Sequence, residues 1–157
     1  MSLLQLLKLT VAMPLIGAFI LVGLRHLRSA HWINQGTSFA TFVGTLLVAW
    51  RVYSGERIQS DWLQIDALNV PLLMLTGFIG LTTSIFSRPY MQRKHDLGDV
   101  QINGLRLYHS MYQIFVFTML LALTTNNLGV MWVAIEGATL ATVLLVSLYR
   151  TPEAIEA

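Results

Sequence analysis

The chain has 157 residues, of which 55% are hydrophobic and only 11% are charged, and its mean hydropathy is +0.62. Because soluble domains carry about 25% charged residues, this composition excludes a water-soluble fold and indicates an integral membrane protein. The formal net charge of +2 and the scattered cations exclude a nucleic-acid-binding role. The sequence has no cysteine, which excludes disulfides, iron–sulfur clusters, thiolate zinc sites and cysteine nucleophiles.

Five stretches are long and apolar enough to cross a bilayer as helices, which takes about 20 residues. They cover residues 3–24, 34–53, 69–88, 107–125 and 128–149. The first precedes its cations, unlike a secretory signal, so we expect a retained helix, which Pro14 should kink. Only Asn126 and Asn127 separate the last two stretches, which predicts an antiparallel helical hairpin.

The loops between these stretches differ in their content of Lys and Arg, which predicts the orientation of the chain. One side of the membrane receives seven of these residues: Arg25, Arg28, Arg88, Arg93, Lys94, Arg106 and Arg150. The other side receives Arg51 and Arg57, with Lys8 as a third that snorkels outward. We therefore expect the first side to be cytoplasmic and the N-terminus to face outward. Residues 54–66 then form an outer loop with a short hairpin, and residues 89–106 form a solvated cytoplasmic loop.

Aromatic side chains mark the same two interfaces, because Trp and Tyr gather at the level of the lipid headgroups. The outer belt would hold Trp50, Tyr53 and Trp62, and the inner belt Trp32, Tyr90, Tyr108 and Tyr149. Small residues recur at helical spacing, where helix backbones approach closely. They are Thr37, Thr41, Gly44 and Thr45, then Thr76, Gly80, Thr83, Ser84 and Ser87, then Ala134, Gly137, Ala138 and Ala141. These stripes indicate a packed bundle and do not indicate an activity.

Glu136 is the main candidate for a functional residue, because it lies near the middle of the fifth stretch. A charged side chain there costs about 2.5–3.5 kcal/mol, so the carboxyl should favour its neutral form and exchange protons. At about 100° per residue it shares a face with Trp132 and Leu140, opposite the seam of Ala134 and Ala138. We therefore expect protein or a hydrated cavity on both sides of this helix. The alternative is a protonated acid that only bonds a neighbouring helix.

His109 is the second candidate, because an imidazole near the cytoplasmic start of the fourth stretch could admit protons. Gln113 lies one turn further in. A histidine of the Tyr108 and Tyr112 interfacial belt is an equally good interpretation. The other predictions are structural: helix caps at Asp66 and Asn69, solvated loop positions for His26, His31 and His95, and a positive-inside anchor at Arg106.

Several kinds of chemistry have no motif in this sequence. It contains neither the P-loop nor the Rossmann glycine pattern, no recognisable Ser/His/Asp arrangement and no His/carboxylate cluster with metal-ligand spacing. We therefore predict no catalytic residue, cofactor, metal or redox site in this chain.

The segment LYHSMYQIFVFTMLLALTTNNLGVMWVAIEGATLATVLLVSLYRTPEAIEA resembles the antiporter-like, proton-translocating membrane subunits of respiratory complex I, Mrp-type antiporters and group 4 nickel–iron hydrogenases. The segment NNLGVMWVAIE, followed by LLVSLYRT, is most similar to hydrogenase-4 component F. Upstream, IDALNVPLLMLTGFIGLTTSIFSRPYM resembles the third helix of that family and the loop after it. The resemblance implies that Glu136 matches the fifth-helix glutamate, which works with a lysine on a later helix; that lysine has no counterpart here.

The resemblance implies the organisation and role of the chain. Residues 1–106 would hold three transmembrane helices with outer and cytoplasmic loops, and residues 107–157 a helical hairpin that begins the proton-translocating module, cut off before the next helix. The chain would be a multi-pass subunit of the inner membrane that contributes part of a path for H+ or Na+. Other membrane subunits would be its partners and hold the redox chemistry, and the bilayer would surround it.

Two alternatives remain from the sequence. One is a scaffold or assembly subunit, or a truncated fragment, with no transport of its own. The other is a membrane anchor for haem or quinone, which is disfavoured because only His109 is expected inside a helix.

Overall fold

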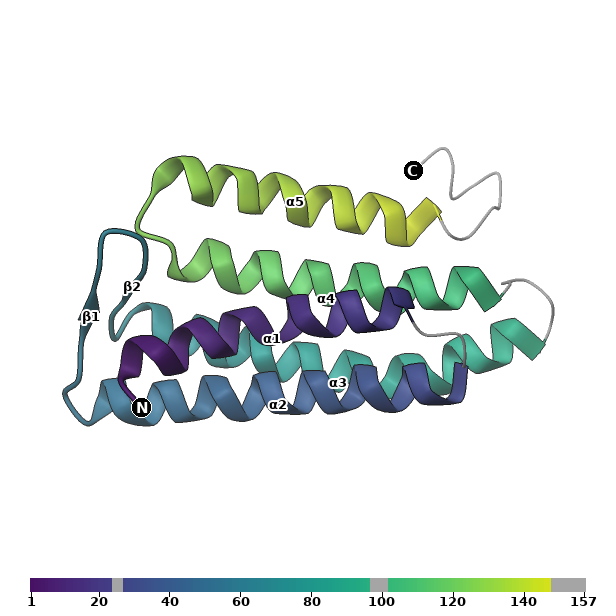
Figure 1. Cartoon of the computed structure of the whole chain (residues 1–157), viewed down its shortest axis with the longest axis horizontal. Coiled ribbons are helices and arrows are strands. Elements are labelled where there is room, and N and C mark those ends of the chain that lie inside the picture. The colour runs from purple at the N-terminus through teal and green to yellow at the C-terminus, as the bar shows by residue number, and fades with distance from the viewer. Residues whose placement is uncertain (24–26, 97–101, 148–157) are drawn as a thin grey trace.

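The computed structural model describes residues 1–23, 27–96 and 102–147, and nearly all of them are helical (Figure 1). The elements are α1 (Leu3–Gly23), α2 (Leu27–Tyr53), β1 (Ile58–Gln59), β2 (Gln64–Ile65), α3 (Asn69–Asp96), α4 (Ile102–Thr124) and α5 (Leu128–Ser147). The helices lie side by side, and successive helices run in opposite directions (Figure 1). This is the all-helical architecture that the composition predicts.

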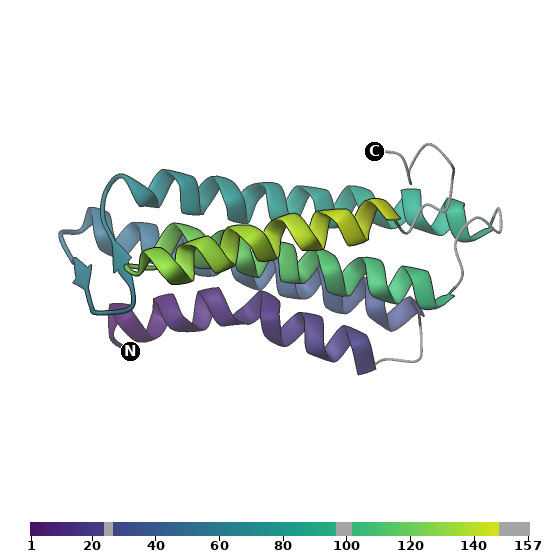
Figure 2. The same ribbon diagram turned by 90° about the horizontal axis from the view of Figure 1, so that it is seen from above.

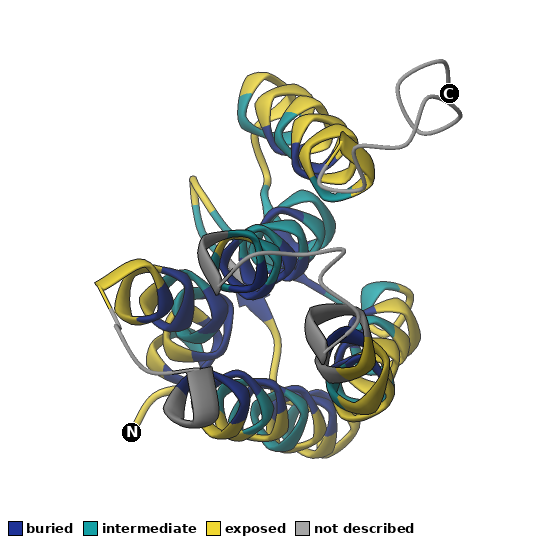
Figure 3. Cartoon of the chain, turned by 90° about the vertical axis from the view of Figure 1, so that its right-hand side faces the viewer, coloured by how far each residue is buried: buried dark blue, intermediate teal, exposed yellow. Residues whose placement is uncertain are grey.

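Helix α4 occupies the centre of the bundle. It packs against α1, α2, α3 and α5, and α2 also packs against α1 and α3. Helix α5 packs chiefly on α4 and stands at the edge of the bundle, as the end-on view shows (Figure 3). Helix α1 contains Pro14, and its axis changes direction near the middle in the view from above, as predicted (Figure 2).

Four helical segments in the described part of the chain are long and apolar enough to cross a membrane: Leu3–Gly23, Asn69–Met91, Gly104–Thr124 and Leu128–Ser147. Helix α2, the second of the five predicted spans, has 27 residues but is less apolar than the other four. Seven of its buried positions follow alternating steps of three and four residues and are mostly polar: His31, Asn34, Ser38, Thr41, Thr45, Val48 and Val52. Ala30 and Ala49 beside this series are buried as well. The helix therefore turns its polar side chains inward, toward the other helices.

The prediction of a solvated loop over residues 89–106 is wrong. Helix α3 continues to Asp96 and α4 already begins at Ile102, with residues 97–101 outside the described part. Met91 and Leu105 are buried against each other, with Tyr108 packed beside them. Apolar contact between the two helix ends thus extends both helices past the polar residues that suggested a loop. Helix α2 likewise begins at Leu27, earlier than the predicted residue 34.

The short hairpin predicted within residues 54–66 is confirmed as the antiparallel pair β1 and β2, with Ile58 opposite Ile65. The hairpin contacts the short turn between α4 and α5, where the backbone N–H of Asn126 donates to the carbonyl of Trp62 at 3.0 Å. The side-chain amide of Asn126 also donates to the carbonyl of Ser60 at 3.1 Å. The predicted cap is confirmed too: Asp66 Oδ1 accepts hydrogen bonds from the N–H groups of Leu68 and Asn69, each at 3.0 Å.

The interior differs between the two ends of the bundle. At the hairpin end it is an apolar core drawn from α1, α2, both strands, α3 and α4, with Leu7, Val48, Leu73 and Leu120 fully buried. At the other end polar side chains are buried between α2, α3 and α4. The predicted packing of α5 through small residues is confirmed by the burial of Ala134, Ala138 and Ala141.

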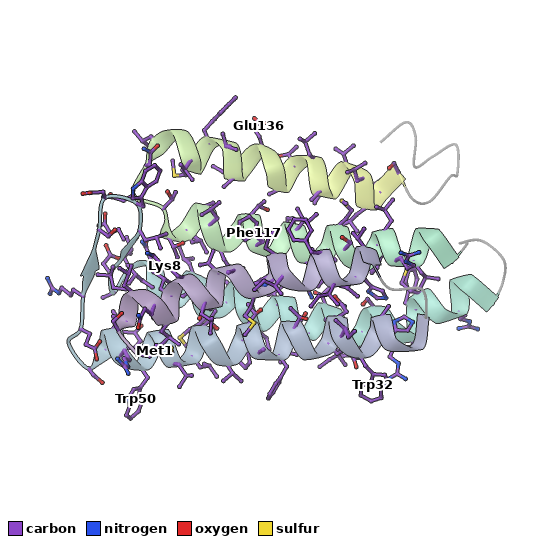
Figure 4. All side chains as sticks on the ribbon, in the orientation of Figure 1. Met1, Lys8, Trp32, Trp50, Phe117 and Glu136 are labelled. Atoms are coloured by element: carbon purple, nitrogen blue, oxygen red, sulfur yellow. The ribbon has the colours of Figure 1, made fainter. Side chains whose placement is uncertain are left out.

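Exposed aromatic residues lie at both ends of the bundle, as the predicted belts require. Trp50 is exposed at the hairpin end and Trp32 at the other end (Figure 4). Tyr53 and Trp62 are exposed near the hairpin, and Tyr90 is exposed near the end of α3. Tyr108 is only half-buried between helices, and Tyr149 lies outside the described residues. The guanidinium carbon of Arg88 lies 4.9 Å from the centre of the Trp32 ring, which joins α3 to α2 at this end.

Candidate functional site

Two histidines on different helices meet inside the bundle. His31 lies in the second turn of α2 and His109 in the second turn of α4, and the two helices bring Nε2 of His109 to 3.0 Å from Nδ1 of His31. The rings meet edge to face, with their centres 4.7 Å apart. His31 is 9% exposed and His109 is 1% exposed. The described structure therefore contains a hydrogen-bonded imidazole pair that is shielded from the surroundings.

Polar side chains continue from this pair toward the middle of the bundle. Gln113, one turn after His109, donates its side-chain amide to Asn34 Oδ1 at 2.8 Å and to Ser38 Oγ at 3.0 Å. The Asn34 amide in turn donates to Ser84 Oγ at 2.9 Å, which brings α3 into the network. Asn34, Ser38, Ser84 and Gln113 are each less than 4% exposed. We call these four residues, with His31 and His109, the polar cluster.

Two contacts from α4 to α1 hold the cluster in place. Ser110, next to His109, donates its hydroxyl to the carbonyl of Ala18 at 3.2 Å. Arg106 donates to the carbonyl of Val22, near the end of α1. A cation at a helix C-terminus also interacts favourably with the helix dipole. Arg106 is therefore more than the predicted positive-inside anchor, because it ties α4 to the end of α1.

Two polar atoms in the cluster have no hydrogen-bond partner among the described residues: Nδ1 of His109 and Oε1 of Gln113. Both residues are essentially fully buried. An unsatisfied buried donor or acceptor costs about 1–3 kcal/mol, so such atoms are rare in folded proteins. Where they occur, they usually mark a bound water, an ion or a group with a catalytic role.

Glu136 lies elsewhere, near the middle of α5 and on its exposed face (Figure 4). Trp132, Leu140 and Val143 share that face and are 58–64% exposed. The opposite face, with Ala134 and Ala138, packs on α4. The predicted division of the helix into a small-residue face and a carboxyl face is therefore confirmed. Only the small-residue face is covered by other described elements.

The two candidate residues are therefore not brought together. His109 points from α4 toward α2, whereas Glu136 points away from α4 on the far side of α5. An apolar groove of about 430 Å³ runs between α3, α4 and α5, with Ile79, Phe115 and Val146 among its lining side chains. No polar chain links the cluster to Glu136 within the described part of the molecule.

His109 lies in the bundle interior, and Tyr112, which the alternative interpretation grouped with it, is also buried, with its hydroxyl donating to the carbonyl of Gly80. The prediction that His31 is solvated in a loop is wrong, because α2 begins four residues before it. The structure gives a different reason to disfavour haem. Two facing imidazoles exist, but their nitrogens bond each other at 3.0 Å, and a metal between them would need about 2 Å on each side.

No family model matches the chain. Curated relatives include the hydrogenase-4 component F homolog of Methylacidiphilum infernorum (isolate V4), which is 42% identical over 147 residues. That alignment covers 94% of this chain and 30% of the relative. NADH-quinone oxidoreductase subunit L of Mycobacterium tuberculosis (strain CDC 1551 / Oshkosh) is 30% identical over 168 residues, covering 93% of this chain and 25% of the relative. The chain therefore spans between a quarter and a third of the length of these relatives.

Proposed function

Because the chain belongs to the family of antiporter-like membrane subunits of hydrogenase and complex I assemblies, we propose that it contributes part of a proton path in such an assembly. The similarity covers nearly the whole chain, so it includes both candidate residues and the helices that carry them. Redox chemistry would take place in partner subunits, and the chain itself would be a non-catalytic, multi-pass subunit of the inner membrane.

The observation that carries this proposal is the place of Glu136. It is the only ionisable side chain in α5, whose 20 residues are otherwise apolar or small. Ionisable residues inside membrane spans are rare, and they mark ion paths and proton relays more often than packing contacts. Glu136 would bind and release the transported proton in the course of its passage.

The exposed face around Glu136 supports a role inside a larger assembly. A carboxyl among Trp132, Leu140 and Val143 would be costly against lipid. The relatives are three to four times longer than this chain, so an assembly of their kind offers further helices to cover the face. We propose that other helices pack here and supply the basic partner of Glu136.

His109 would act at the other end of the path, on the side predicted to be cytoplasmic. Its burial and its polar neighbours fit a residue that passes protons inward better than one that only faces the interface. The path from the polar cluster to Glu136 would then be completed by residues of the assembly outside this chain.

Replacing Glu136 by glutamine in the assembled complex tests the proposal. Glu136→Gln keeps the shape and the hydrogen bonding but removes the proton site, so redox-driven proton uptake into inverted vesicles should fall by about a hundredfold or to background. Leu140→Gln is the matched control, because it adds an amide to the same exposed face and leaves the carboxyl in place.

The outcomes separate the competing functions. Loss of uptake with normal assembly supports the proton path, and unchanged uptake in Glu136→Gln overturns it. Loss of assembly with intact coupling in the complexes that do form favours a scaffold. Measuring redox-driven uptake of Na+ in place of H+ by the same vesicles distinguishes H+ from Na+ as the coupling ion.

A further inference from the structure

We infer that His31 and His109 form a single proton-binding unit, in which His31 is the member nearer to solvent and a bound water joins His109 to Gln113. The placing of this unit on a proton path rests on the function proposed above. The unit itself rests on the geometry of the polar cluster.

The contact between the two rings allows only one proton between them. At 3.0 Å, one nitrogen must carry a hydrogen and the other must accept it. If both imidazoles were protonated, two N–H groups and two positive charges would face each other across this contact. The pair can therefore take up one proton beyond its neutral form, and that proton is shared by both rings.

The charged groups around the pair also disfavour a second added proton. Arg88 lies over Trp32, next to His31, and Arg106 begins the turn of α4 that leads to His109. The nearest aromatic neighbour is Tyr108, whose ring centre is 5.4 Å from that of His109. The carboxylates with described side chains are elsewhere: Glu56, Asp61 and Asp66 beside the hairpin, and Glu136 on the outer face of α5. A second positive charge would find no described carboxylate beside it.

Exposure decreases along the cluster and gives it a direction. His31 is 9% exposed, His109 is 1% exposed and Gln113 is not exposed at all. His31 also lies only four residues from the start of α2, at the end of the bundle predicted to be cytoplasmic. A proton would therefore reach His31 first and pass to His109 through the shared hydrogen bond.

The two unpartnered atoms continue this direction inward. His109 Nδ1 and Gln113 Oε1 belong to residues four apart, on one face of α4. One water can donate to Gln113 Oε1 and, with its other atoms, either accept from or donate to His109 Nδ1. It thus satisfies both atoms in either tautomer of the pair, as buried waters with two or more partners do. The chain from His31 to His109 to water can then carry a proton by successive transfers.

Nuclear magnetic resonance of the full chain in lipid nanodiscs, with ¹⁵N-labelled histidine, tests the inference. The sequence has four histidines, so the double variant His26→Gln/His95→Gln leaves His31 and His109 as the only imidazoles in the chain. We expect a scalar coupling between His31 Nδ1 and His109 Nε2 across the hydrogen bond. On acidification the two rings should together take up one proton and not two. A cross-peak from His109 to water should report the bound water between His109 and Gln113.

The control is His31→Gln in the same background, which removes one ring and keeps a side chain able to accept a hydrogen bond. It should abolish the coupling, and in the assembled complex it should slow proton uptake several-fold. Absence of the coupling in the double variant, or uptake of two independent protons, overturns the paired unit. Absence of the water cross-peak overturns the bound water. These results are independent of Glu136→Gln: the pair can fail while Glu136 still carries protons, and the reverse.

Discussion

Thr10 of α1 packs its side chain directly against the backbone of Gly44 in α2. A Cβ atom at position 44 would lie 2.6 Å from the Thr10 hydroxyl oxygen, closer than real Cβ contacts allow. The same arrangement joins Gly17 to Thr37 and Gly77 to Thr45, so three Gly–Thr contacts set the spacing of α1, α2 and α3. The small residues that the sequence marked on α2 are therefore the places where helix backbones come close.

Replacing Gly44 by alanine should destabilise the bundle by about 1–3 kcal/mol, because the β-branched Thr10 has few rotamers with which to move away. Gly36→Ala in the same helix is the control, since nothing lies within 4 Å of a Cβ there. That substitution should be neutral or stabilising by up to about 1 kcal/mol, the helix propensity difference. Unfolding in increasing dodecyl sulfate measures both. Equal effects of the two substitutions would contradict the close contact.

Asn34 links three helices, so Asn34→Ala should cost more than a loss of side-chain packing. Its side-chain amide donates to the Ser84 hydroxyl, and its Oδ1 accepts from the Gln113 amide; both partners are buried. We expect a loss of about 1–3 kcal/mol in the same unfolding measurement. Gln35→Ala, at the adjacent half-buried position, should change stability by no more than about 0.5 kcal/mol. A mild effect at position 34 would contradict the hydrogen bonds of Asn34 with Ser84 and Gln113.

Asn127 caps α5, because its Oδ1 accepts hydrogen bonds from the N–H groups of Gly129 at 2.9 Å and Val130 at 3.2 Å. Asn127→Ala should weaken the start of the helix by about 1 kcal/mol, whereas Asn127→Asp keeps an acceptor and should not. Amide hydrogen exchange at positions 129 and 130 is the measurement. We expect faster exchange only in the alanine variant, and equal exchange in both would contradict the cap.

The sequence has no cysteine, so the predicted orientation can be tested with single cysteines in an otherwise unreactive chain. Ser54 and Tyr90 are exposed at opposite ends of the bundle. A membrane-impermeant maleimide should label Ser54→Cys in intact cells, and label Tyr90→Cys only after the cells are opened. The reverse pattern would place the N-terminus in the cytoplasm, against the distribution of Lys and Arg.

The division of α5 into two faces and the outer hairpin were predictable, because helical periodicity, small residues and turn residues act locally. The position of His31 was not. The buried stripe of α2 repeats in steps of three and four residues, but its members include His31, Asn34 and Ser38. A search for apolar periodicity does not find such a stripe, although the spacing itself was present in the sequence.

The extension of α3 and α4 was missed for a related reason. Residues 89–106 contain enough charge and glycine to suggest a loop, and only the contact between Met91 and Leu105 shows that both helices continue. That contact joins residues from two elements, so no pattern within either one reveals it. The contact between His31 and His109 likewise depends on how α2 packs against α4, because the two histidines are 78 residues apart in sequence.

The contact between the hairpin and Asn126 has a further consequence for Glu136. An α-helix rises about 1.5 Å per residue, so Glu136, eight residues after Leu128, lies about 12 Å along α5 from the first residue of the helix. A hydrocarbon layer is about 30 Å thick, so this distance is close to half of a membrane span. By fixing the turn before α5, the hairpin therefore fixes how far along the bundle the carboxyl lies.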